Sequence, residues 1–368
     1  MKRVLFLIPN LNSGGSQGVF LTILRHIDRS KFQIMLAVVN SDTKALQHLV
    51  PNDIEFVDLK SYRVRHGLGK IIALIWKWRP DTVFSTLSHL NLAIVALKPI
   101  LPLNIKYIAR ESTILSQLIK KKNQPYLHWA YKIFYRNFNL IICQSIFMQK
   151  DLISKFKIPK KNTLVINNPI DLDYINTKVR RGPSKNQLLK GKRSSSTNFL
   201  AVGRLSAVKG FDILIEALSI IKNRDFCLTI IGDGELKSEL KELSFKFGIS
   251  DLVFFEGFQP NPYAWYKNVD ALILSSHYEG FPNVVLESLA CNTPVISTPA
   301  IGGVSEILSN VKGCLMANEV SAVSLADAII EWLSTRKEND FQTTLDQYQV
   351  SKIIGQYEDA IKHNLNDD

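Results

Sequence analysis

The 368-residue chain has few cysteines and no long apolar run, and each shortage excludes a class of protein. Its four cysteines are scattered and form no CxxC pair, so we expect reduced, mostly buried thiols and a cytoplasmic location. No apolar stretch reaches the roughly 18 residues that a membrane-spanning helix needs. The apolar start ends at Pro9 and no small-residue cleavage site follows, so we interpret it as a buried strand rather than a signal peptide.

Signatures of metal and nucleophilic catalysis are also missing. The only acidic pair with a metal-like spacing is Asp171 and Asp173, which has no partner histidine or further carboxylate, and we interpret it as structural. Ser275, Ser276 and His277 are too close in sequence to form a nucleophilic triad by themselves. We therefore expect neither a bound metal nor another cofactor.

Acidic residues are scarce in the first half of the chain. Residues 1–193 hold 32 Lys and Arg against 10 Asp and Glu, whereas the remainder holds 13 against 23. The first half has a net charge of +22 and the rest −10, within a total of +12. A basic half of this kind predicts an anionic partner.

Two stretches of the basic half, 63–79 and 118–136, combine Lys and Arg with Trp and Tyr at helical spacing. This pattern fits a helix that rests on anionic lipid headgroups, and it fits equally a core helix with a solvated basic side. Nucleic acid would also attract the charge, but no nucleic-acid motif accompanies it. We expect an anionic membrane surface as partner and no nucleic acid.

Apolar strands alternate with amphipathic helices along the chain, the pattern of parallel sheets covered by helices. In the first half the predicted strands are residues 4–8, 32–39, 54–59, 82–85, 106–109, 140–143 and 163–166. The pattern restarts at residue 198, after a polar stretch with Gly and Pro where the charge changes sign. We predict an α/β protein with domains at 1–180 and 198–345, a linker at 181–197, and a terminal amphipathic helix within 346–368.

The most informative stretch is 269–287. Its first residues predict a short buried strand, and its end predicts a helix with either Asn283 as N-cap or Pro282 as first residue. Open α/β sheets bind ligands at the carboxyl ends of their strands, and a helix N-terminus binds anions. Glu279 and Glu287 flank this helix start, which suits a ligand with hydroxyls at both ends and phosphate between them. A sugar nucleotide has that form.

Three other loops carry candidate ligand groups. Arg204 and Lys209 share the loop after the first strand of the second half, where a guanidinium and an ammonium fit a diphosphate. Gly232 allows a close backbone approach to a ligand, but its segment lacks the third glycine of a dinucleotide-binding fingerprint. Gly14 and Gly15 follow the first strand and can bring backbone amides to a phosphate or a sugar.

In their order, these motifs resemble retaining glycosyltransferases of family 4, which have the GT-B fold. The resemblance is carried by residues 202–211, 231–235, 279–287 with E-x7-E spacing, and 294–307, and more loosely by 14–15, 88–91, 109–111 and 168–171. It implies two Rossmann-like domains that face each other across a cleft, with the C-terminal helix packed back on the N-terminal domain. The chain looks most like the transferases that build bacterial surface polysaccharides or lipid-linked oligosaccharides.

The resemblance also implies roles for single residues. Arg204 and Lys209 hold the diphosphate of the donor, Glu279 its sugar and Glu287 its ribose; the first three are the implied catalytic residues. The other implied donor contacts are Gly14, Gly15, Gly232, Phe258, Gly280, Phe281, Pro282, Asn283 and Val284, and the implied acceptor contacts are His89, Asn91, Arg110 and Glu111. Gln17 stands where the family often has an acid, which puts an acid role there in doubt.

We therefore expect a metal-independent enzyme that moves a hexose or N-acetylhexosamine from a nucleotide diphosphate sugar, a UDP-sugar rather than a GDP-sugar. The acceptor is lipid-linked or a saccharide, and the protein is peripheral on the inner face of the cytoplasmic membrane. The alternative is a non-catalytic sugar-nucleotide sensor or a scaffold of a polysaccharide-assembly complex. Turnover of donor separates the two.

Overall fold

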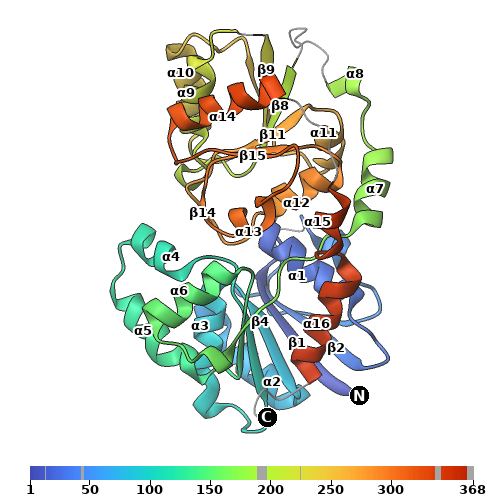
Figure 1. Ribbon diagram of the computed structural model, residues 1–368. Coiled ribbons are helices and arrows are strands. Elements are labelled where there is room, and N and C mark those ends of the chain that lie inside the picture. The colour runs from blue at the N-terminus through green and yellow to red at the C-terminus, as the bar shows by residue number, and fades with distance from the viewer. Residues whose placement is uncertain (13, 43–44, 189–196, 224, 336–340, 363–368) are drawn as a thin grey trace. The chain divides into compact units, whose positions relative to one another are not determined.

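The computed structural model describes residues 1–12, 14–42, 45–188, 197–223, 225–335 and 341–362. The chain forms two compact units: unit 1 is Met1–Pro169 with Val350–Asp368, and unit 2 is Ile170–Gln349. Each unit has one all-parallel main sheet with helices on both faces, the predicted α/β class (Figure 1). Within these described ranges no helix has both the length and the apolarity to cross a bilayer.

The sheet of unit 1 contains all seven strands predicted for the first half of the chain. They are β1 (Lys2–Asn10), β2 (Phe32–Asn40), β3 (Glu55–Asp58), β4 (Thr82–Thr86), β5 (Lys106–Arg110), β6 (Leu140–Cys143) and β7 (Thr163–Val165). Their order is β3-β2-β1-β4-β5-β6-β7, so Val4 of β1 pairs with Ile34 on one side and Thr82 on the other. The strands are mostly apolar because both faces of a parallel sheet are buried.

Helices cover both faces of this sheet. They are α1 (Gly15–His26), α2 (Val64–Trp78), α3 (Ser88–Leu97), α4 (Leu115–Lys122), α5 (Tyr126–Phe134), α6 (Ile146–Phe156) and the terminal α16 (Val350–Lys362). On the face of α1 and α16 the rings of Phe6, Phe20 and Phe84 pack together, with centroids 5.1–5.3 Å apart, and Phe84 meets the other two edge-on. Gly67 of α2 lies against Val39 on the opposite face.

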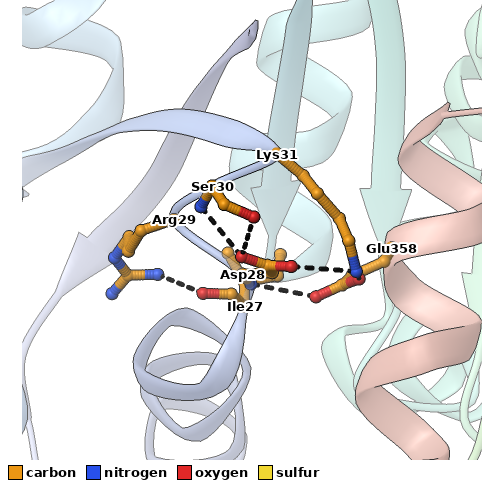
Figure 2. A network of polar contacts seen from close by, with 6 residues as sticks. All are labelled: Ile27, Asp28, Arg29, Ser30, Lys31 and Glu358. Carbon is orange, nitrogen blue, oxygen red and sulfur yellow. Dashed lines mark hydrogen bonds and ion pairs between the residues drawn. The ribbon is translucent and has the colours of Figure 1, made fainter.

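The terminal helix α16 packs on unit 1 beside α1, the position that the sequence predicted (Figure 1). Polar contacts fix it as well as apolar ones. The Glu358 carboxylate accepts hydrogen bonds from the Asp28 amide at 2.9 Å and from Lys31 Nζ at 2.7 Å (Figure 2). Lys106 Nζ donates to the Ala360 carbonyl at 2.8 Å, and so satisfies one of the carbonyls that a helix leaves free at its C-terminus.

The main sheet of unit 2 has the order β10-β9-β8-β11-β13-β15. Its strands are β8 (Thr197–Val202), β9 (Phe226–Ile231), β10 (Val253–Gly257), β11 (Ala271–Leu274), β13 (Val295–Ser297) and β15 (Leu315–Met316), and β12 (Tyr278–Glu279) pairs separately with β14 (Ile301–Gly302). One face packs on α9 (Phe211–Ile220), α10 (Lys237–Lys246) and α14 (Ala322–Thr335). The other packs on α7 (Leu172–Arg180), α11 (Tyr263–Lys267), α12 (Asn283–Ala290), α13 (Val304–Leu308) and α15 (Gln342–Asp346).

The predicted domain boundaries need correction. The chain passes into unit 2 at Ile170, not at residue 181, because α7 packs on α11. The start of the predicted linker also belongs to unit 2, since Gly182 lies against Ala264 and Leu188 is buried in its core. Residues 189–196 of the predicted linker lie outside the described residues.

Candidate functional site

The candidate donor site of unit 2 lies where the strand order reverses, between β8 and β11. Ligands of doubly wound sheets bind at such a switch point, beyond the carboxyl ends of the strands. The loops that follow these two strands, residues 203–210 and 275–282, touch each other. The His277 amide donates to the Val208 carbonyl and Ser275 Oγ donates to the Lys209 carbonyl, both at 2.9 Å. We call these segments the switch-point loops.

An ion pair joins the two switch-point loops. Lys209 Nζ lies 2.6 Å from Glu279 Oε1, and the two side chains are only 24% and 12% exposed. Ser276 Oγ donates to the same carboxylate oxygen at 2.7 Å. Two predicted catalytic residues, 70 positions apart in the sequence, are therefore in direct contact.

A glycine is required where the first switch-point loop turns into α9. Gly210 has φ +59°, and a Cβ atom there would lie 2.2 Å from the Ser275 carbonyl oxygen. Both the left-handed backbone and this close approach exclude a side chain. Gly210 thus lets the backbone that carries Lys209 reach the loop that carries Glu279.

Gly232 is also required for a close approach, but its neighbour is protein and not a ligand. It has φ +135°, and a Cβ atom there would lie 1.8 Å from the Gly203 carbonyl oxygen. The Leu205 amide donates to the Asp233 carbonyl at 3.0 Å in the same packing. Gly232 therefore supports the loop that carries Arg204, and its contact with the donor stays a prediction.

Glu287, the second carboxylate of the E-x7-E motif, lies in the second turn of α12 and is partly buried. Burial raises the pKa of its carboxyl to about 7, and a hydrogen bond from Tyr266 partly offsets this. The Tyr266 hydroxyl donates to Glu287 Oε2 at 3.1 Å. Near neutral pH this carboxyl can therefore exist in either protonation state.

Helix α12 begins directly after the second switch-point loop. Pro282 is the N-cap, with φ −80° and ψ 100°, and Asn283 is the first helical residue. Both expectations for the cap were therefore wrong. Among the described residues no side chain caps this end, and helix geometry leaves first-turn amides outside the intrahelical hydrogen-bond ladder. The Phe281 side chain is buried against Tyr348, so a ligand can reach Gly280 and Phe281 only through the backbone.

The remaining predicted donor residues of unit 2 are exposed. Arg204 lies in the switch-point loop after β8, and among the described residues its guanidinium has no recorded ion-pair partner. Phe258 follows β10 and is 56% exposed. Both come after the carboxyl ends of strands of the same sheet, and this leaves them available to a ligand there.

In unit 1 the glycine loop leads into α1. Gly14 is the N-cap of this helix, no side chain caps it, and its first turn, which begins at Gly15, has no acid. Gln17 Nε2 donates to Asn10 Oδ1 at 3.1 Å. The position that often holds an acid in the resembling family thus ties α1 to the end of β1.

Three of the four predicted acceptor residues are buried in a polar network at the end of β4, β5 and β6. The Glu111 carboxylate accepts hydrogen bonds from Ser88 Oγ and Asn91 Nδ2, each at 2.8 Å, and from the Tyr135 hydroxyl. Burial raises the pKa of Glu111. Asn91 and Glu111 therefore face each other and not a ligand, and their predicted acceptor contact is corrected to a structural role.

Arg110 belongs to the same network. Its guanidinium is fully buried and donates to Asn168 Oδ1 at 2.6 Å, to the Tyr357 hydroxyl at 3.2 Å and to Ser16 Oγ at 3.4 Å. It connects β5 with α1 and α16. Of the four predicted acceptor residues only His89 is exposed.

Sequence reasoning missed two residues of the site. Ser276 contacts Glu279, and Tyr266 contacts Glu287. Ser276 lies within the motif stretch and could have been found there, whereas nothing in the sequence around Tyr266 distinguishes it from a core aromatic residue. Asp171, the first member of the acidic pair, caps α7 by accepting from the Tyr174 amide.

Comparison with known proteins matches a glycosyltransferase family to each half of the chain. The family described as "Glycosyltransferase Family 4" matches residues 13–174, and "Glycosyl transferases group 1" matches residues 187–346. An uncharacterized glycosyltransferase of Methanocaldococcus jannaschii is 32% identical over 260 residues, which is 67% of this chain and 62% of the relative's length. The chain thus spans less than two thirds of that relative.

Two other similarities extend over the whole chain. A Campylobacter jejuni protein, named N-acetylgalactosamine-N,N'-diacetylbacillosaminyl-diphospho-undecaprenol 4-alpha-N-acetylgalactosaminyltransferase, is 28% identical and covers 99% of this chain and 100% of its own. The crystal structure of Anabaena HepE, in complex with UDP and glucose, has a TM-score of 0.79 at 19% identity over 98% of this chain and 99% of HepE. The latter similarity shows a shared fold.

Proposed function

The chain belongs to the family 4 glycosyltransferases with the GT-B fold, and on this premise we propose that it transfers a hexose or N-acetylhexosamine from a UDP-sugar with retention of configuration. The observation that carries the proposal is the contact of Lys209 with Glu279 at the switch point of unit 2. In it, a cation and a carboxylate meet beside an uncapped helix N-terminus.

This arrangement suits a departing nucleoside diphosphate. The diphosphate gains negative charge as the bond to the sugar breaks, and a preorganised cation and helix dipole stabilise that charge. Lys209 exchanges its Glu279 partner for a phosphate oxygen, Arg204 adds a second cation, and Glu279 becomes free to accept hydrogen bonds from sugar hydroxyls. Because side-chain cations and backbone amides supply the positive charge, we expect transfer to continue after divalent metals are chelated.

The proposed acceptor is lipid-linked or a saccharide, within the synthesis of a cell-surface polysaccharide. Support comes from the C. jejuni relative, whose name specifies a diphospho-undecaprenol acceptor and whose alignment covers 99% of this chain. The excess of positive charge in the first half of the chain suits an acceptor that carries a diphosphate.

We further propose that α4 and α5 of unit 1 rest on an anionic membrane surface. Tyr126, Trp129 and Ile133 are 64%, 60% and 58% exposed, and their spacing places them on one face of α5. Lys120, Lys121 and Lys122 form the last turn of α4, and Lys132 Nζ lies 4.8 Å from the Trp129 ring centroid. An apolar aromatic face with a lysine border is typical of interfacial helices. We name these six residues of α4 and α5, with Lys132, the α4–α5 patch.

The stretch over α2 does not support the same role. Ile71, Ile75 and Trp78 of α2 are buried, and Trp76 donates its Nε1–H to the Ile100 carbonyl at 3.2 Å. This helix therefore fits the alternative interpretation of the sequence, a core helix with a solvated basic side.

Substitution of Lys209 by Ala tests the enzyme proposal. We expect hydrolysis of UDP-sugars and transfer to a membrane lipid extract both to fall by about 10²–10³, the effect of removing one group that stabilises transition-state charge. Lys246→Ala, at an exposed lysine of α10, is the matched control and should keep wild-type rates. Wild-type rates in Lys209→Ala contradict the site. Binding of UDP-sugars by the wild-type chain without turnover supports the sensor or scaffold instead.

A further inference from the structure

Tyr266 is a fully buried tyrosine whose hydroxyl ends at the donor site. It lies on α11, and its hydroxyl donates to Glu287 Oε2 at 3.1 Å. No other donor to the Glu287 carboxylate is recorded among the residues that the structure describes. The second oxygen, Oε1, therefore retains its capacity to accept a hydrogen bond from a ligand.

The surroundings of Tyr266 fix the position of that hydroxyl. Thr293 Oγ1 donates to the Tyr266 carbonyl at 2.6 Å, and this ties α11 to the segment after α12. The Tyr266 ring packs against that of Tyr263, with centroids 6.5 Å apart, in the same apolar cluster as Val285 and Leu289 of α12. A side chain held from several directions has few alternative rotamers, so its hydroxyl is preorganised toward Glu287.

We propose that Tyr266 is a positioning residue for donor binding, whose hydroxyl holds one oxygen of Glu287 so that the other faces the ribose hydroxyls of the nucleotide. The inference rests on the proposed function for the identity of the ligand. Without the Tyr266 hydroxyl the carboxylate can rotate away from the ribose, and it also loses the one recorded hydrogen bond that favours its charged form.

The charge state of Glu287 gives the inference a measurable signature. Burial raises the pKa of this carboxyl to about 7 and the Tyr266 hydrogen bond lowers it, so loss of the hydroxyl should raise it further. The titratable groups around the pair are Tyr263 and Lys267 on α11 and Cys291 after α12. On α13, the charge of Glu306 adds to burial in raising the pKa of Tyr348. The Glu287 charge helps to raise the pKa of Cys291, but the pKa of Glu287 itself is shifted by burial and by the Tyr266 hydrogen bond, so Tyr266 is the side chain whose removal should shift its titration.

The test compares Tyr266→Phe with Tyr263→Phe, which removes a hydroxyl from the same helix. Calorimetry measures the binding of UDP and of 2′-deoxy-UDP between pH 5.5 and 9. In the wild type we expect binding of UDP to weaken below about pH 7 as Glu287 is protonated, and UDP to bind roughly tenfold more tightly than 2′-deoxy-UDP. Tyr266→Phe should move the pH midpoint upward and remove most of that preference, whereas Tyr263→Phe should keep both.

Two outcomes overturn the inference. One is an unchanged ribose preference and pH midpoint in Tyr266→Phe; the other is a loss of affinity that is equal at every pH and for both nucleotides, as a general packing defect would give. A carbon-13 NMR titration of the Glu287 carboxyl needs no ligand and should show a higher pKa in Tyr266→Phe. If the wild type binds no nucleotide, the proposed function fails, while this titration still decides whether Tyr266 controls Glu287.

Discussion

Replacing Glu287 by Gln should make unit 2 more stable at alkaline pH, although it should weaken donor binding. The Glu287 pKa is raised by burial from 4.5 to about 7, so the native chain keeps a proton that the unfolded chain has already released. Stability is therefore highest below pH 4.5 as far as this group is concerned, and it falls as pH rises from about 4.5 to about 7. Gln has nearly the same shape, carries no charge and can still accept from Tyr266.

The size of the effect follows from the pKa. Each pKa unit is worth about 1.4 kcal/mol, so the shift of the Glu287 pKa corresponds to about 3 kcal/mol, which is an upper limit for the effect on stability. For a unit of this size each kcal/mol moves Tm by about 2–4 °C. We therefore expect Glu287→Gln to raise the Tm of unit 2 by up to roughly 6–12 °C at pH 8.5 and to leave it nearly unchanged at pH 4.5.

Thermal unfolding followed by circular dichroism at the two pH values measures this difference. Glu242→Gln, at an exposed carboxylate of α10, is the matched control and should leave Tm nearly unchanged at both. An equal or lower Tm of Glu287→Gln at pH 8.5 would refute the reasoning, since Glu287 would then carry its charge without cost. A charged Glu287 therefore lowers the stability of unit 2, as is common for residues that serve ligand binding.

Two further predictions concern other parts of the chain. Gly232→Ala places a Cβ atom 1.8 Å from the Gly203 carbonyl oxygen, so we expect unit 2 to lose several kcal/mol of stability or not to fold. Urea unfolding measures this loss, and a wild-type midpoint would contradict the close approach. The chain should co-sediment with vesicles of anionic lipid at low salt and leave them as the salt concentration rises. Trp129→Ala should weaken this association. Phe245→Ala, at an aromatic residue of α10 that is 78% exposed, is the control and should not weaken it. Equal sedimentation of all three proteins, or none at low salt, argues against the α4–α5 patch.

Most of the fold could be predicted from the sequence because the strands of a parallel sheet are buried on both faces. The strands of unit 1 are mostly apolar runs, with the edge strand β3 (sequence EFVD) as the exception, and the alternation with helices specifies the sheet type. The boundary of unit 2 could not be predicted, because α7 belongs to it through contacts with α11, about ninety residues further along the chain.

The site was predicted less completely, for a similar reason. Lys209 and Glu279 follow adjacent strands, so the sheet topology brings them together, and their motifs identified them separately. Charged residues in an apolar setting are ambiguous in a sequence: Arg110 and Glu111 were predicted to contact the acceptor, but the fold buries them with neutral hydrogen-bond partners. Tyr266 meets Glu287 only through tertiary packing, and no local pattern records that contact.

The central claim is that the donor diphosphate binds at the switch-point loops of unit 2. Hydrogen exchange with and without UDP tests it most directly, because bound ligand slows the exchange of the amides it covers. We expect UDP to slow exchange in residues 203–210 and 279–290, and Lys209→Ala to abolish that protection. Protection confined to other segments, with these two unchanged, would contradict the claim.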